Sequence, residues 1–68
     1  MKTKQYSIVF HTDECYMEAM ALSDIHTYYD VDAAELELFW NSKHKRDNAV
    51  RLLKQHDITV DTYDGVPI

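Results

Sequence analysis

Residues 25–41, IHTYYDVDAAELELFWN, determine which of two architectures the chain adopts. In both halves of this segment, larger apolar and β-branched side chains alternate with their neighbours, and a period of two is typical of strands. A helix that continued past Trp40 would instead place Lys43 and Asp47 on its apolar stripe. We therefore predict two strands joined by a short connection.

A helix over residues 33–41 is the competing interpretation. Asp32 and Glu35 have the spacing of a capping box, and Val31 and Leu36 have that of a hydrophobic staple. The connection between the predicted strands also lacks the Gly or Asn that a tight hairpin favours. The alternative architecture is therefore βαααβ, with this segment helical.

The N-terminal segment predicts a strand followed by a helix. Residues 5–11 are rich in β-branched and aromatic side chains, which favour a strand. Thr12 suits a helix N-cap. Apolar residues at helical spacing then predict a helix over residues 13–23.

The C-terminal segment predicts a second helix and a last strand. Ser42 suits the N-cap of a helix that continues to about His56, with His56 on its apolar face. Residues 58–63 alternate as a strand, and Asp64-Gly65 predicts a turn at its end.

This order of elements is that of the ferredoxin-like βαββαβ fold. We predict one small α+β domain over residues 1–68, with two helices on one face of a four-stranded antiparallel sheet. A chain of this length supports only a small core.

Charge is distributed unevenly along the chain, whose net charge is −5. No Lys or Arg lies between Gln5 and Ser42, whereas eight of the twelve acidic residues lie there. Five of the seven basic residues follow closely: Lys43, Lys45, Arg46, Arg51 and Lys54. The acidic balance argues against non-specific nucleic-acid binding as the main task, because affinity for phosphates comes from clustered cations.

We predict a non-enzymatic, regulatory protein, inhibitor-like or accessory, that binds a protein partner with a basic surface. An acidic surface steers such a partner, and aromatic side chains dominate interface energetics. No catalytic residue and no cofactor is predicted. The predicted partner-binding residues are Glu14, Glu18, Tyr29, Asp30, Asp32, Glu35, Glu37, Phe39 and Trp40.

Two other functions compete with this one. The first is nucleic-acid binding through Lys43, Lys45, Arg46 and Arg51, with Tyr28 or Tyr29 as a stacking platform. The second is self-association, in which the acidic first helix of one copy meets the basic second helix of another. A homodimer is an expectation under either protein-binding scheme.

Metal binding and membrane insertion are not predicted. His11, Asp13 and Cys15 are residue types that bind zinc, but a structural zinc site generally needs four ligands. Cys15 is the single cysteine, which excludes a disulfide within the chain and fits a reducing compartment. No apolar run approaches the ~20 residues of a membrane helix, and no signal-peptide core is present. We therefore expect a cytoplasmic protein, similar in its short, acidic, glycine-poor composition to accessory proteins of phages and mobile elements.

Overall fold

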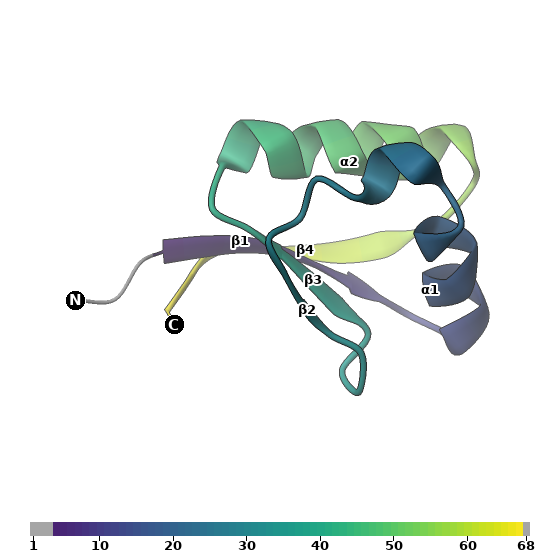
Figure 1. The fold of residues 1–68 in the computed structure, drawn as a ribbon, viewed down its shortest axis with the longest axis horizontal. Coiled ribbons are helices and arrows are strands. Elements are labelled where there is room, and N and C mark those ends of the chain that lie inside the picture. Colours follow the sequence, from purple (N-terminus) through teal and green to yellow (C-terminus); the bar gives the residue numbers. More distant parts are fainter. Residues whose placement is uncertain (1–3, 68) are drawn as a thin grey trace.

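The computed structural model describes the backbone of residues 4–67 and the side chains of residues 5–65. Its elements follow in the order β1 (Lys4–Phe10), α1 (Asp13–Met20), the 3₁₀ helix η1 (Ser23–Ile25), β2 (Asp30–Asp32), β3 (Glu37–Trp40), α2 (Lys43–Gln55) and β4 (Val60–Pro67). The strands form one sheet in the order β2-β3-β1-β4, and every pairing is antiparallel. The predicted ferredoxin-like architecture is confirmed, with the helices layered on one face of the sheet (Figure 1).

The segment between η1 and α2 is a hairpin, so the competing helix over residues 33–41 is wrong. The Asp32 carboxylate does accept a hydrogen bond from the Glu35 N–H, at 3.3 Å, as in a capping box. Here the bond closes a turn. Leu36 is the last residue of this turn, and its φ is positive, at 55°. The first predicted strand is shorter than expected, because Ile25 ends η1 and only Asp30–Asp32 pairs with β3.

Both predicted N-caps are confirmed. Thr12 Oγ1 accepts a hydrogen bond from the Cys15 N–H at 3.1 Å, and Ser42 Oγ accepts one from the Lys45 N–H at 3.3 Å. The first helix ends at Met20, earlier than predicted, since the chain turns into η1 and buries Ile25 completely.

Two predictions about the C-terminal segment are wrong. His56 caps the end of α2 and is exposed, so it does not belong to the apolar face of that helix. Asp64-Gly65 does not end the last strand but forms a bulge inside β4, where the two residues lie opposite Tyr6 alone. Gly65 has a φ of 68° there, which a residue without Cβ adopts at little cost.

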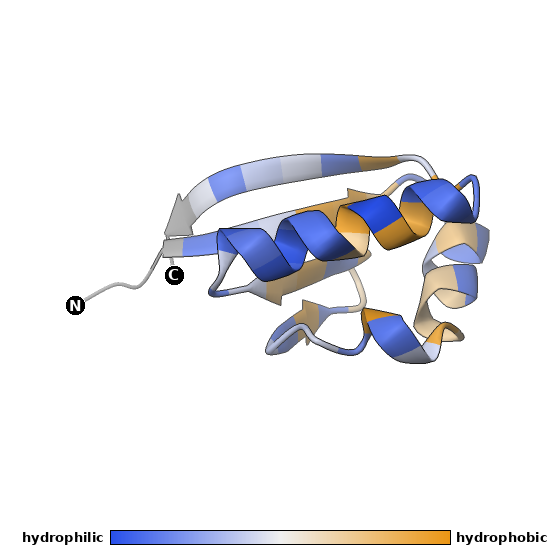
Figure 2. Cartoon of the chain, turned by 90° about the horizontal axis from the view of Figure 1, so that it is seen from above, coloured by the Kyte–Doolittle hydropathy of each residue, from blue (hydrophilic) through white to orange (hydrophobic). Residues whose placement is uncertain are grey.

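The core lies between the sheet and the helix layer. It consists of Ile8, Phe10, Ala19, Ile25, Leu38, Trp40, Ala49, Leu53 and Ile58. Trp40 is 1% exposed, and its indole N–H donates to Thr27 Oγ1 at 2.9 Å, so the ring is both buried and hydrogen-bonded. Most hydrophobic residues of α2 lie in its C-terminal half, whereas its N-terminal half is hydrophilic (Figure 2). No helix in the described range has the length and apolarity required to cross a bilayer.

Candidate partner-binding face

The sheet face that points away from the helices is the candidate site, and we call it the open face. Successive side chains of a strand point to opposite faces. Ile8 and Leu38 face the core, so their neighbours Ser7 and Phe39 belong to the open face. The strand register then assigns the remaining members, and the open-face residues are Gln5, Ser7, Val9, Asp30, Asp32, Glu37, Phe39, Asp61 and Tyr63.

A row of carboxylates crosses the open face. Asp32 on β2 pairs with Glu37 on β3, Glu37 pairs with Val9 on β1, and Val9 pairs with Asp61 on β4. Side chains directly opposite on neighbouring strands have Cβ atoms about 5 Å apart, and like charges at such positions destabilise a sheet. We therefore expect the opposed Asp32 and Glu37 to lower the stability of the fold.

Among residues 5–65, whose side chains the structure describes, no Lys or Arg belongs to this face, because all five lie on α2 in the opposite layer of the molecule. His11 lies beside the face, with its Nε2 3.2 Å from Asp61 Oδ2 at the end of the row and both side chains about half exposed. The open face is therefore negative and the α2 surface positive.

A second row combines aromatic rings with a buried hydroxyl. Asp30 pairs with Phe39, Phe39 with Ser7, and Ser7 with Tyr63. Tyr63 is 51% exposed and Phe39 is partly buried, whereas Ser7 between them is fully buried. Among the described residues, Ser7 Oγ and the neighbouring Gln5 Oε1 have no hydrogen-bond partner. The centre of the open face thus combines aromatic rings with buried polar side chains.

The structure brings four of the nine predicted partner-binding residues together on the open face: Asp30, Asp32, Glu37 and Phe39. Glu35 is exposed in the adjoining turn, and Glu14 and Glu18 are exposed on α1, in the helix layer. Trp40 is buried in the core, so its prediction as a contact residue is corrected. Alternation along β3 places the Trp40 ring on the core face and the Phe39 ring on the open face.

Tyr29 lies just before β2 and is 47% exposed. Its backbone N–H donates to the Phe39 carbonyl at 2.9 Å, which extends the pairing of the hairpin by one bond. Loss of hydration and then the negative charge of Asp30 raise the pKa of the Tyr29 phenol. The phenol therefore stays protonated beside the acidic strand.

The predicted partner-binding residues lack five members of the open face: Gln5, Ser7 and Val9 on β1, and Asp61 and Tyr63 on β4. Asp61 and Tyr63 belong to the alternating segment that predicted the last strand, and they occupy the same face of it. The missing information was the position of β4 beside β1, which places them next to Val9 and Ser7.

Arg46 is only 3% exposed, although the sequence placed it in a basic cluster for nucleic acid. Its guanidinium donates to the Ser7 carbonyl at 3.3 Å, to the Tyr63 carbonyl at 3.1 Å, and to Asp64 Oδ1 at 2.5 Å. Its Nε donates to Asp47 Oδ1 at 2.9 Å, and the group lies 5.8 Å from the centroid of the Tyr6 ring. Burial disfavours the charged form of Arg46, but the hydrogen bonds to the two carboxylates outweigh this effect and raise the pKa of Arg46. This side chain is occupied inside the protein.

The remaining cations of that cluster stay at the surface. Lys43 lies 3.4 Å from Asp64 Oδ2, and Arg51 donates to Asn48 Oδ1. Within the described residues, no ion pair joins α1 to α2, and η1 contacts both helices.

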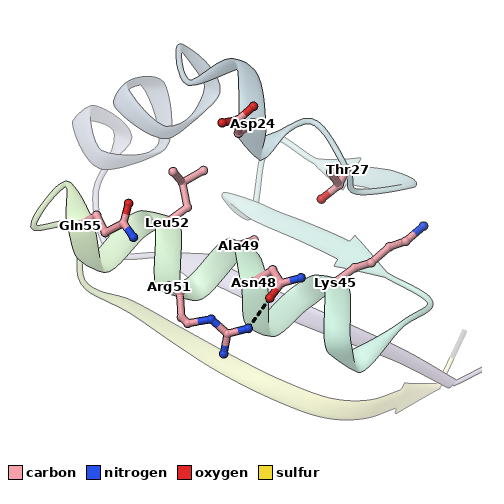
Figure 3. Close-up of a pocket in the computed structure, with 8 residues that line it drawn as sticks. All are labelled: Asp24, Thr27, Lys45, Asn48, Ala49, Arg51, Leu52 and Gln55. Carbon is pink, nitrogen blue, oxygen red and sulfur yellow. Dashed lines mark hydrogen bonds between the residues drawn. The ribbon is translucent and has the colours of Figure 1, made fainter.

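A groove of about 390 Å³ separates α2 from the η1 segment (Figure 3). Asp24 and Thr27 line it from the η1 side, opposite six residues of α2: Lys45, Asn48, Ala49, Arg51, Leu52 and Gln55. The groove carries both signs of charge above an apolar base. It is a concave surface of the helix layer, away from the open face.

His11, Asp13 and Cys15 do not assemble into a ligand cluster. His11 is directed to Asp61 on β4, and Cys15 packs beside the core as a free thiol. No group of three His, Cys, Asp or Glu side chains with a metal-binding arrangement occurs in the described part of the chain.

No protein-family model, curated protein or solved structure matches this chain. The residues of the open face are therefore the basis for a functional proposal.

Proposed function

We propose that this chain is a binding domain whose open face holds the basic surface of a partner protein. The observation that carries the proposal is the pair Asp32 and Glu37, two carboxylates directly opposed on neighbouring strands of a face to which no Lys or Arg of residues 5–65 belongs. A sheet that served stability alone would favour a cross-strand pair of opposite charge at this place. A partner that supplies Lys or Arg relieves the repulsion when it binds.

The aromatic row complements the charged one. Phe39 and Tyr63 flank Ser7 and offer apolar area beside the carboxylates, and aromatic side chains are enriched among the residues that dominate interface energies. Charge complementarity speeds the encounter and selects the partner. The rings then supply the contact area that holds the complex.

The contrast between the positive α2 surface and the negative open face supports the same orientation. The positive α2 surface repels a basic partner, and the negative open face attracts it. A basic protein is therefore steered away from α2 and toward the open face.

The experiment compares two variants that each remove two negative charges. One is D32N/E37Q, on the open face, and the other is E14Q/E18Q, on the exposed surface of α1. Binding of a fluorescent oligolysine peptide is measured by anisotropy across a salt series. We expect D32N/E37Q to weaken binding about tenfold and to flatten its salt dependence, and the α1 variant to change it less than about threefold. Equal losses in the two variants would mean that net charge alone is responsible.

The partner itself is identified by capture from nuclease-treated lysate of the source cells. A basic protein that the wild-type chain retains, that D32N/E37Q releases and that a salt step elutes is the expected result. Recovery of nucleic acid that nuclease abolishes, unchanged by D32N/E37Q, would support the α2 cations instead.

A further inference from the structure

A second candidate binding site is the free edge of β4. The strand runs over Val60–Pro67 at the end of the sheet, beside β1, and no strand among the described residues pairs with its other edge. Its first four residues, Val60–Tyr63, pair regularly with β1 before the bulge at Asp64-Gly65. An edge strand presents unpaired N–H and C=O groups that accept a further strand.

A groove adjoins this part of β4. It has a volume of about 260 Å³ and lies between α2 and the start of the strand. Val50, Ile58 and Val60 supply its apolar lining, and Lys54, Asp57 and Thr59 complete it. A side chain from an added strand reaches such a groove while its backbone pairs with β4.

The two faces of β4 differ in their surroundings, so a strand added to its edge needs different side chains on each face. Val60 packs toward the core and Thr62 shares its face, whereas Asp61 and Tyr63 belong to the open face. An added strand continues this division, because its side chains also alternate between the faces. Aliphatic residues suit the groove, and basic residues suit the side on which Asp61 lies at the end of the carboxylate row.

The opposite edge of the sheet fits a guest strand less well. β2 has only three residues, all of them exposed, and Asp30 and Asp32 are two of these. Short, charged edge strands are typical of edges that resist pairing. Neither the groove beside η1 nor the groove beside β4 is lined by a residue of β2.

We propose that Val60–Tyr63 bind an extended peptide of alternating aliphatic and basic residues as a fifth strand of the sheet. This inference rests on the proposed function, since the basic side chains of the peptide join the acidic open face. Backbone hydrogen bonds to β4 give affinity, and the groove and Asp61 select the side chains. The ligand is thus a strand-forming basic segment of a partner protein.

The test uses the fluorescent peptide acetyl-Lys-Val-Lys-Val-Lys-Val-amide and two singly N-methylated forms of it. One carries the methyl group on the central Lys and the other on the adjacent central Val. Successive N–H groups of a strand point to opposite edges, so only one of the two methyl groups faces β4. We expect one form to lose about tenfold in affinity and the other to change less than about threefold.

The same peptides measured with D32N/E37Q separate this inference from the proposed function. Equal affinity of the two methylated forms, together with weaker binding to D32N/E37Q, would overturn strand addition and leave the acidic face as the binding surface. One-sided loss on methylation without an effect of D32N/E37Q would support strand addition and remove the role of Asp32 and Glu37 in binding this peptide. Absence of binding by the unmethylated peptide would overturn the inference.

Discussion

Arg46 Nη2 lies 2.5 Å from Asp64 Oδ1, a contact that joins α2 to the bulge of β4. The same guanidinium binds the carbonyls of Ser7 and Tyr63, the residues that pair just before the register shifts. A bulge disrupts the regular ladder of hydrogen bonds, and Arg46 supplies donors at this place. The pair therefore holds the helix layer, β1 and β4 in one arrangement.

Replacing Arg46 with Ala is expected to lower the free energy of unfolding by about 3 kcal/mol, since the buried Ser7 carbonyl and the partly buried Tyr63 carbonyl lose their donor. The half-exposed Asp64 is rehydrated more easily, which limits the loss. Urea denaturation measures the change. Arg51→Ala, on the exposed side of the same helix, is the matched control and should stay within about 0.5 kcal/mol of wild type. Similar losses in the two variants would contradict the anchoring role of Arg46.

Protonation of Asp64 at acidic pH is expected to lower the stability of the fold. The hydrogen bond and charge of Arg46 lower the pKa of this carboxyl below its ordinary value of 3.8. A depressed pKa in the folded state contributes stability that is present above pH 3.8 and disappears as the pH falls through the folded value. Unfolding midpoints in urea, measured from neutral pH downward, should show a smaller acid loss in Asp64→Asn than in wild type. Parallel pH profiles would exclude this contribution.

Replacing Glu37 with Gln should stabilise the fold. The substitution removes the repulsion from Asp32 directly across the hairpin, and such cross-strand terms are worth about 0.2–1 kcal/mol. Glu35→Gln, in the exposed turn two residues earlier, is the control and should change the unfolding free energy less. A variant that is more stable and binds oligolysine more weakly indicates a carboxylate kept for function. Destabilisation by Glu37→Gln would argue that the row is structural.

Ser7→Ala tests the unpartnered hydroxyl at the centre of the open face. A buried polar atom without a partner costs about 1–3 kcal/mol, so its removal should leave stability unchanged or raise it. Thermal denaturation measures this directly. Thr12→Ala, which removes the N-cap of α1, is a useful contrast and should cost about 1 kcal/mol. Destabilisation of Ser7→Ala comparable to that contrast would show that the hydroxyl is satisfied in solution.

Much of the fold could be predicted from local patterns in the sequence. Period-two alternation predicted the strands, and the same alternation explains why Phe39 and Trp40 lie on opposite faces of the sheet. Hydroxyl side chains at Thr12 and Ser42 predicted the starts of both helices. These features depend on backbone periodicity and on hydrogen bonds between residues three apart, so the sequence contains them directly.

The binding face required the complete fold. Asp61 and Tyr63 join the hairpin residues only because β4 crosses to the far side of β1, and that register depends on contacts distant in sequence. Arg46 resembles its neighbours Lys43 and Lys45 along the chain, but it is buried because the bulge of β4 brings Asp64 and two carbonyls to it. A residue's charge is a local property, whereas its burial and its partners arise from how helices and strands pack.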